Sequence, residues 1–165
     1  MKILVFSDSH GNTNLIRKAI EAHKDSTDLI IHLGDKVTDS RIFSELCPHI
    51  ANINIFGNCD YFSSGVEAYD EKLLQLGNTR IKAFLCHGHD YSVKSRTDIL
   101  TVKAKMCGAK IALYGHSHIA SISESEGILL MNPGSVSQPR GTEPASYGVI
   151  QIEDNEIMPS IIFDR

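Results

Sequence analysis

The stretch Ile111-Ala112-Leu113-Tyr114-Gly115-His116-Ser117-His118 is an apolar run followed by two histidines with one residue between them. The apolar run is typical of a buried β-strand, so the histidines lie where a strand ends and a loop begins. Residues i and i+2 of an extended segment point to the same side, so both imidazoles can face one site. A transition metal ion is a common partner for such imidazoles, although a His-x-His pair also occurs on ordinary protein surfaces.

Four other apolar runs end in side chains that can bind a metal ion. They are followed by Asp8 and His10, by Asp35, by Asn58 and by His87. In open α/β sheets, binding sites form beyond the carboxyl ends of the strands. We therefore predict that these side chains and the two histidines above meet at one edge of the fold.

The pattern of apolar residues alternates between strands and helices over the first two thirds of the chain and is mostly strand in the last third. We predict helices at 14–24, 40–46 and 97–107 and a polar loop at 61–65. The expected strands are 2–7, 28–33, 50–56, 72–76, 80–85, 110–114, 119–123, 128–131, 147–153 and 156–163. This order predicts an α/β domain with a mixed sheet or two packed sheets, and we expect residues 1–165 to form a single domain.

The composition is that of an ordinary globular protein, with 42% hydrophobic and 22% charged residues. The net charge of −4 argues against general nucleic-acid binding. No apolar run approaches the ~20 residues that a membrane helix needs, and the start of the chain lacks the features of a signal peptide. We therefore expect a cytoplasmic protein that does not bind membranes. The four cysteines form no Cys-x-x-Cys pair, which argues against a zinc ribbon or a disulfide framework.

The candidate ligands combine carboxylate, amide and imidazole groups without a pair of thiolates, which argues against a structural zinc site. Seven ligands exceed the needs of one catalytic ion that must keep a coordination position open, so two ions fit better. Two divalent ions roughly 3.5–4 Å apart can hold a bridging hydroxide and a phosphate group for in-line displacement.

Five short motifs follow the order of the calcineurin-like metallophosphoesterase family, which the chain resembles over nearly its whole length. They are Asp8-x-His10, Gly34-Asp35, Gly57-Asn58-x-Asp60, His87-Gly88 and Gly115-His116-x-His118. The small size and the stretch Asn132-Pro133-Gly134-Ser135 make the chain similar to the compact bacterial and archaeal phosphodiesterase branch of that family.

The resemblance implies a four-layer αββα sandwich, in which two packed mixed β-sheets are flanked by helices. It implies three ligands for each of two divalent ions and one carboxylate shared by both: Asp8, His10 and His118 for the first ion, Asn58, His87 and His116 for the second, and Asp35 as the bridge. The family's usual activating ion is Mn²⁺, with Ni²⁺, Fe²⁺ or Zn²⁺ as alternatives.

The third motif departs from the pattern of much of the family, which has a histidine thought to protonate the leaving group where this chain has Cys59. The compact branch carries the same Gly-Asn-Cys-Asp form. General acid catalysis is worth ~10²–10⁴-fold, so the cysteine suggests substrates whose leaving groups need little protonation. His89 is a candidate substitute acid, and Arg140 is a candidate for binding the phosphate.

Several of these residues also have a plain structural interpretation. Cys59 could be a pocket-lining thiol, His89 a loop residue and Arg140 a surface residue. Asp8 could cap a helix, and Asn58 could be a turn residue. We expect three further residues to be structural or solvated rather than catalytic: His32 buried within a strand, and His23 and His49 in solvent.

We therefore predict a metal-dependent phosphodiesterase that acts on a small phosphodiester, with Asp35, Cys59, His89 and Arg140 as the candidate catalytic residues. The alternatives are a phosphomonoesterase of the same fold and a non-catalytic scaffold, the role that a metal-poor member of this fold has in the retromer. Asp60 is expected to support a histidine or the loop rather than a metal ion. The sequence leaves a homo-oligomer open.

Overall fold

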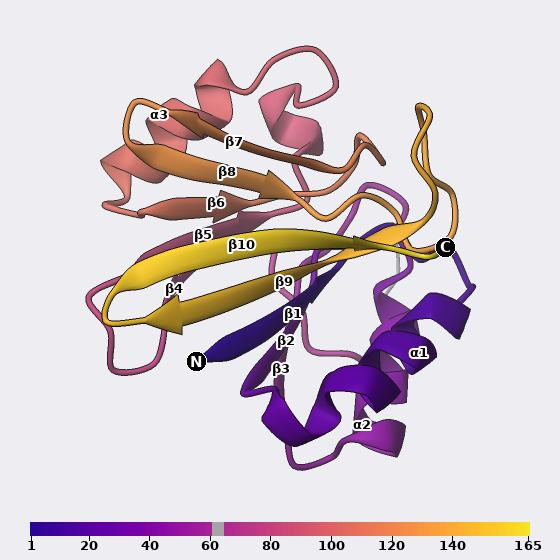
Figure 1. Cartoon of the computed structure of the whole chain (residues 1–165). Coiled ribbons are helices and arrows are strands. Elements are labelled where there is room, and N and C mark those ends of the chain that lie inside the picture. The colour runs from indigo at the N-terminus through magenta and orange to yellow at the C-terminus, as the bar shows by residue number, and fades with distance from the viewer. Residues whose placement is uncertain (61–64) are drawn as a thin grey trace.

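The computed structural model describes residues 1–60 and 65–165, so the polar loop expected at 61–65 lies outside the described residues apart from its last position. Two five-stranded sheets pack face to face (Figure 1). The first sheet contains, in spatial order, β10 (Glu156–Phe163), β9 (Ser146–Glu153), β1 (Lys2–Phe6), β2 (Leu29–His32) and β3 (Ala51–Asn54). The second contains β4 (Glu71–Gln75), β5 (Lys82–Cys86), β6 (Ile111–Leu113), β8 (Ile128–Asn132) and β7 (Ser121–Ser125).

Both sheets are mixed, and helices cover their outer faces. In the first sheet β1 is parallel to β2 and antiparallel to β9, and in the second β6 is parallel to β5 and β8. The first sheet is covered by α1 (Asn14–His23) and α2 (Arg41–Leu46), and the second by α3 (Asp98–Met106). Single 3₁₀ turns lie at η1 (Lys24–Ser26), η2 (Val37–Ser40) and η3 (His89–Tyr91). The predicted αββα sandwich is confirmed.

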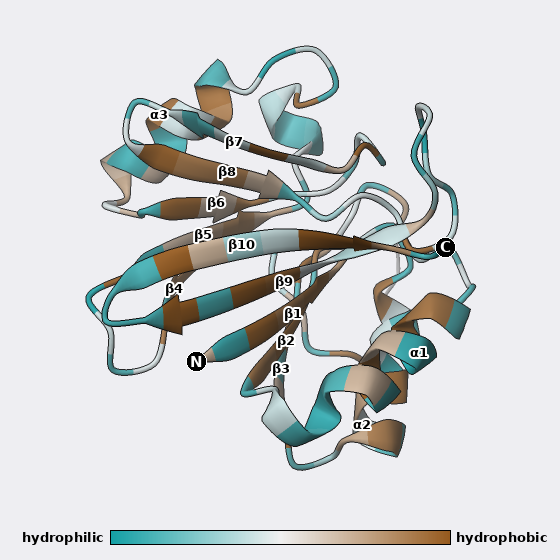
Figure 2. Cartoon of the chain, viewed as in Figure 1, coloured by the Kyte–Doolittle hydropathy of each residue, from teal (hydrophilic) through white to brown (hydrophobic). Residues whose placement is uncertain are grey.

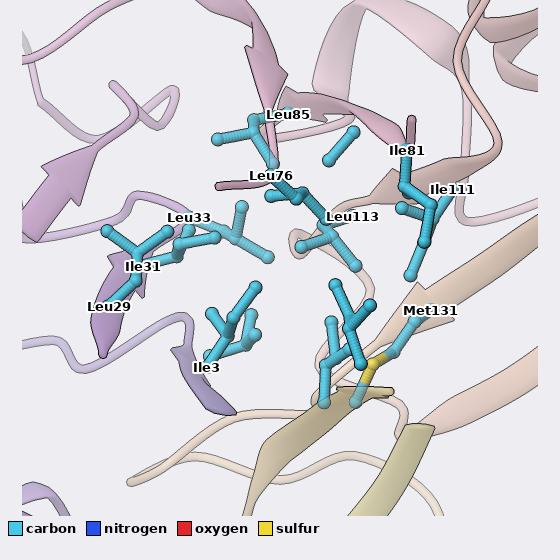
Figure 3. Close-up of a cluster of buried hydrophobic side chains, with 14 of the residues drawn as sticks. Ile3, Leu29, Ile31, Leu33, Leu76, Ile81, Leu85, Ile111, Leu113 and Met131 are labelled. Carbon is cyan, nitrogen blue, oxygen red and sulfur yellow. The ribbon is translucent and has the colours of Figure 1, made fainter. Parts of the chain in front are cut away.

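The core lies in three layers because side chains alternate between the two faces of each strand. On β1, Ile3 and Val5 belong to the layer between the sheets, whereas Leu4 and Phe6 pack under α1 and α2. Figure 3 shows the layer between the sheets, to which both sheets contribute. In Figure 2, β6 and β8 are brown over most of their length, while α1 alternates between brown and teal, as a helix with one buried face should.

All of the predicted helices and strands occur, each within two residues of its expected ends, the limit within which assignments of helix and strand ends normally agree. The strand expected at 50–56 ends earlier, at Asn54. Beyond it, the chain turns to bond with Tyr69, whose backbone N–H donates to Asn54 O (3.0 Å) and whose carbonyl accepts from Phe56 (2.9 Å). No helix of the described residues is long and apolar enough to cross a membrane.

Two histidines outside the predicted site have fixed environments. His23 is half-buried rather than solvated, because its Nε2 lies 3.1 Å from the Tyr147 hydroxyl and its Nδ1 3.0 Å from Lys2 Nζ. His32 is fully buried at the end of β2, where its Nδ1 accepts the Gly34 N–H (3.2 Å). Its Nε2–H therefore points to Ser9 Oγ, 3.1 Å away.

Burial lowers the pKa of His32 from 6.5 to about 4. Below pH 6.5 the unfolded chain binds a proton at His32 and the folded chain does not. The contribution of neutral, buried His32 to the free energy of unfolding is therefore complete above pH 6.5 and is lost as the pH falls toward 4. Between about pH 7 and about pH 4, this residue should lower the free energy of unfolding of the metal-free wild type by up to about 3 kcal/mol. We expect urea unfolding to show that His32→Gln removes this pH-dependent decrease. His49→Gln, which changes an exposed histidine, is the control and should leave the pH dependence unaltered. Parallel curves for the wild type and His32→Gln would contradict this assignment.

Candidate metal centre

Loops at the carboxyl ends of strands from both sheets carry the predicted ligands Asp8, His10, Asp35, Asn58, His87, His116 and His118. Backbone hydrogen bonds join these loops in pairs. The Asp8 N–H donates to Gly34 O (2.9 Å) within the first sheet, and the Gly115 N–H donates to His87 O (2.9 Å) within the second. The site therefore lies where the two sheets meet at one edge, as the sequence predicts.

A left-handed backbone conformation is shared by five of the predicted ligands: Asp8 (φ 55°), His10 (φ 46°), Asp35 (φ 59°), His116 (φ 65°) and His118 (φ 60°). Non-glycine residues rarely adopt this conformation, and it costs about 1–3 kcal/mol where it occurs under strain. Such residues gather at functional sites, and here the conformation turns consecutive loop side chains toward one point.

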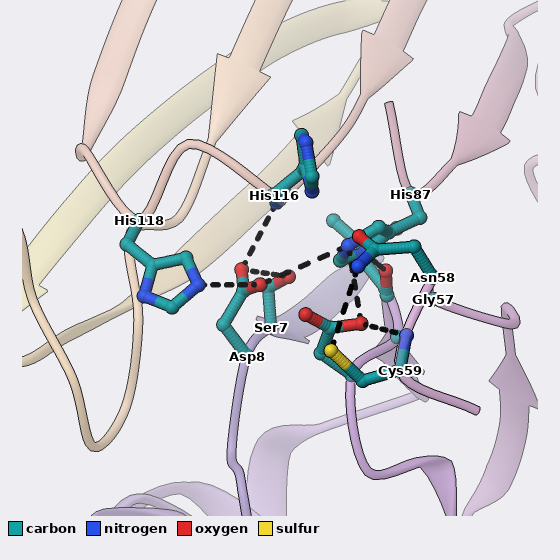
Figure 4. A network of polar contacts seen from close by, with 12 residues as sticks. Ser7, Asp8, Gly57, Asn58, Cys59, His87, His116 and His118 are labelled. Carbon is teal, nitrogen blue, oxygen red and sulfur yellow. Dashed lines mark hydrogen bonds and ion pairs between the residues drawn. The ribbon is translucent and has the colours of Figure 1, made fainter. Parts of the chain in front are cut away.

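The most compact group comprises Asp8, His10, Asp35 and His118, each of which offers one ligand atom within 4.8 Å of all the others. His118 Nε2 lies 3.2 Å from Asp8 Oδ1 and 3.3 Å from His10 Nε2. His10 Nε2 lies 3.7 Å from Asp35 Oδ2. In Figure 4 the Asp8 carboxylate lies between His118 on one side and the group around His87 on the other.

The tautomer of the neutral His118 ring is fixed by the contact of its Nδ1. Its Nδ1 lies 2.7 Å from Gln138 O, and a carbonyl oxygen only accepts, so Nδ1 carries the hydrogen. In the neutral ring Nε2 is then a bare lone pair aimed at the Asp8 carboxylate. Such an arrangement, with the far nitrogen bonded to a backbone carbonyl, is typical of a histidine that binds a metal ion.

His87 has the same arrangement on the other side of the site. Its Nδ1 donates to Leu33 O (2.7 Å), and its Nε2 lies 3.4 Å from Asp35 Oδ1 and 4.0 Å from Asp8 Oδ1. The side chain is wholly buried. The neutral ring of His87 therefore also aims a lone pair at carboxylate oxygens.

When the rings of His87 and His118 are neutral, these converging acceptors need a cation. Within the part of the chain that the structure describes, three buried side-chain atoms here have no hydrogen-bond partner: Asp8 Oδ1, Asn58 Oδ1 and His87 Nε2. A buried polar atom without a partner costs about 1–3 kcal/mol, and more if it is charged. A divalent ion satisfies oxygen and nitrogen lone pairs together, so the residues present fit the predicted metal site.

The second, looser group comprises Asp35, Asn58, His87 and His116. Asp35 turns Oδ2 toward His10 and Oδ1 toward His87, which is the arrangement expected of a bridging carboxylate. The His116 ring lies 5.1 Å from the His87 ring between centroids. Burial, with the positive charge of His87, lowers the pKa of His116 to about 4, so this imidazole is neutral and free to bind a metal near pH 7.

Protons compete with metal ions for this site. Burial alone would lower the pKa values of His87 and His118, but the Asp35 and Asp8 carboxylates raise both above the ordinary value. Burial alone would raise the pKa values of the two carboxyls, but the histidines hold them below the usual range. A metal ion must therefore displace protons from His87 and His118, which makes its affinity depend on pH.

Asp60 holds two ligand loops together rather than facing a metal ion, as expected. Its carboxylate accepts from the backbone N–H groups of Asp35 (3.0 Å), Lys36 (2.9 Å), Val37 (2.9 Å) and Gly57 (2.9 Å). The loops approach so closely that a Cβ at Gly57 would lie 2.2 Å from Asp35 Oδ1, so only glycine fits there.

Three further candidates border the site. Cys59 is exposed; its backbone N–H donates to Asp35 Oδ1 (3.0 Å), and burial with the charge of Asp35 raises the pKa of its thiol. The His89 ring lies 6.1 Å from the His116 ring, and its side chain is 35% exposed. Arg140 is exposed, and its backbone N–H donates to His118 O (3.1 Å). All three stay predictions as catalytic residues.

Some contacts of the site were not predicted. Ser7 Oγ donates to Asp8 Oδ2 (2.6 Å), and Ser135 Oγ donates to Asp8 O (2.7 Å). Asn132 Nδ2 donates to Gly115 O (2.8 Å). The signal available for the last two contacts was the Asn132-Pro133-Gly134-Ser135 stretch, which the sequence indicates as a family feature or as part of the rim of the site, without a role toward Asp8.

Comparisons with known proteins agree with this geometry. The family model of the calcineurin-like phosphoesterase superfamily domain matches residues 1–155. The probable metallophosphoesterase YsnB of Bacillus subtilis is 33% identical over 155 residues, which cover 94% of this chain and 86% of that protein. The phosphodiesterase YfcE of Escherichia coli is 26% identical over 189 residues, covering 98% and 91%.

A solved structure extends the agreement to the fold. It is a Streptococcus pneumoniae protein described as a predicted phosphoesterase, which matches with a TM-score of 0.80 at 29% identity and covers 98% of this chain and 88% of that one. Because the family model spans nearly the whole sequence and the loops after the strands carry the metal-binding residue types, the chain belongs to the calcineurin-like phosphoesterase superfamily.

Proposed function

We propose that this protein is a metal-dependent phosphodiesterase of the compact branch whose third motif reads Gly-Asn-Cys-Asp. The observation that carries the proposal is the convergence of imidazole nitrogens and carboxylate oxygens at the edge where the two sheets meet. The superfamily implies divalent metal ions, and the proposal goes further in assigning two of them, with Mn²⁺ as the preferred ion.

Asp8, His10 and His118 would hold one ion, Asn58, His87 and His116 would hold the other, and Asp35 would bind both. If bound there, a dinuclear centre of this kind would supply positive charge against the phosphate and would provide a hydroxide nucleophile for in-line attack. The chain's own residues orient this chemistry: backbone carbonyls fix the ring nitrogens of His87 and His118, and Asp60 fixes the loop of Asp35.

A small phosphodiester is the substrate class that we propose. The relative YfcE is named a phosphodiesterase, and the exposed Cys59 leaves the site without an imidazole at the position of the family's general acid. A thiol whose pKa is raised above 9 is a weak proton donor near pH 7. The site therefore suits leaving groups that depart without protonation, and we propose Arg140, whose backbone N–H donates to His118 O, as the phosphate-binding residue.

The first test is hydrolysis of bis-p-nitrophenyl phosphate by protein stripped of metal and then reloaded. We expect activity with Mn²⁺, and a loss of ~10²-fold or more in Asp35→Asn and His118→Ala, because a direct ligand costs at least as much as the ~10–100-fold typical of its hydrogen-bonded supports. His49→Ala, at an exposed histidine, is the matched control and should retain full activity.

The same assay separates the alternatives. Faster hydrolysis of p-nitrophenyl phosphate than of the diester would identify a phosphomonoesterase. Absence of turnover with Mn²⁺, Ni²⁺, Fe²⁺ and Zn²⁺ would favour the non-catalytic scaffold. Wild-type rates in Asp35→Asn would refute the site itself.

A second prediction concerns the leaving group. Cys59→His should raise kcat/KM for diesters with poor leaving groups, by up to ~10²–10⁴-fold, because it adds a proton donor beside the site. The measurement is the slope of log kcat/KM against the leaving-group pKa, which should become shallower. Cys59→Asn, a polar residue that cannot serve as an acid, is the control for size and should keep the wild-type slope. An unchanged slope in Cys59→His would show that protonation is supplied elsewhere.

A further inference from the structure

We propose that the loop from Asn132 to Gln138, called here the 132–138 loop, is the positioning element that sets the spacing between Asp8 and His118. This inference rests on the proposed function, because it assigns a role toward the metal ligands of that site. The loop leaves β8 in the second sheet and leads to β9 in the first, so it crosses the same junction at which the ligands meet.

Asn132 holds the loop that carries both histidines. Its Nδ2 donates to Gly115 O (2.8 Å) and to Ser117 Oγ (3.0 Å), and its Oδ1 accepts the Gly134 N–H (2.9 Å). The residue is fully buried, and its amide has partners on both sides. Its orientation is therefore fixed, and it fastens the end of β8 to the turn between β6 and His118.

Ser135 holds the other partner, Asp8. Its Oγ donates to Asp8 O (2.7 Å) and accepts from the backbone N–H groups of Gln138 (2.8 Å) and Ser137 (3.2 Å). Ser137 Oγ donates to the same Asp8 carbonyl at 3.2 Å. Ser135 is fully buried, so water does not replace these bonds if the hydroxyl is removed.

Gln138 completes the connection through its backbone. Its carbonyl accepts the Nδ1–H of His118 at 2.7 Å and thereby aims Nε2 at Asp8 Oδ1. One hydroxyl, that of Ser135, therefore fixes both the Asp8 backbone and the peptide segment that orients His118. The loop acts only through these ligands, which makes its members positioning residues rather than catalytic ones.

The geometry of the two sheets explains why such an element is needed. Asp8 follows β1 of the first sheet and His118 follows β6 of the second, and apolar packing between the sheets is not directional. Hydrogen bonds are directional, and they fix distances that packing leaves free. A metal site requires ligand distances within about 0.2 Å. The bond from the His116 N–H to Asp8 Oδ2 (3.1 Å) joins Asp8 to the loop of both histidines, and the hydrogen bonds of the 132–138 loop fix the remaining distances and the orientation of the His118 ring.

The test measures Mn²⁺ binding to metal-free protein by calorimetry, together with the melting temperature of the metal-free protein. We expect Ser135→Ala and Asn132→Ala to bind Mn²⁺ ~10–100-fold more weakly than the wild type, the range typical for loss of a group that orients a metal ligand. Two variants control for lost buried groups elsewhere: Thr101→Ala, which removes a buried hydroxyl of α3, and Asn54→Ala, which removes a buried amide of β3. Both should bind Mn²⁺ as the wild type does.

A merely structural role predicts a different pattern. It would lower the melting temperature of the metal-free variants and leave Mn²⁺ affinity within about threefold of wild type, less than the ~10-fold lower limit for an orienting group. That result in Ser135→Ala overturns the inference. If Ser135→Ala does not fold, Ser137→Ala decides the question in the same way, since it removes a half-buried hydroxyl from the same Asp8 carbonyl.

The wild-type titration separates this inference from the proposed function. A wild type that binds none of Mn²⁺, Ni²⁺, Fe²⁺ and Zn²⁺ refutes both. A wild type that binds Mn²⁺ and hydrolyses the diester, with variants that bind equally well, overturns the role of the 132–138 loop alone.

Discussion

The carboxylate of Asp8 is the group on which the rest of the site depends. It is fully buried, and its Oδ2 accepts from Ser7 Oγ (2.6 Å) and from the backbone N–H of His116 (3.1 Å), while Oδ1 faces the Nε2 atoms of His118 and His87. One oxygen thus joins the two sheets, and the other needs a cation. A buried negative charge is tolerated only when it is paired, so this carboxylate needs either protonated histidines or a bound cation beside it.

A consequence is that binding and stability are coupled. Without an ion, the raised pKa values of His87 and His118 let protons serve as the counter-charge. An ion that binds only the folded chain stabilises it by mass action, and it does so more strongly as the pH rises and those protons leave. The free energy of ion binding also offsets the cost of the strained left-handed backbone at ligands such as His116 (φ 65°).

The sequence predicted the parts of this protein that follow from periodicity. Apolar runs marked the strands, and polar residues directly after them, such as Asp35 and His87, had to reach one edge of the sandwich. It did not predict how far apart these groups lie, because distances across the two sheets depend on loop bonds. The roles of Asn132 and Ser135 were missed for that reason, since a Pro-Gly turn reads only as a loop. His23 was wrongly expected in solvent, because its contact with Tyr147 joins residues far apart in the chain.

Position 59 shows why one site residue can vary while its neighbours cannot. The backbone N–H of Cys59 donates to Asp35 Oδ1, a contact that any residue except proline makes, whereas its side chain is exposed at the rim. Gly57 and Asp60 on either side are fixed by close approach and by backbone donors. A change from histidine to cysteine would therefore alter the proton donor without moving the carboxylate, and under the proposed function the identity of this one side chain selects the leaving groups.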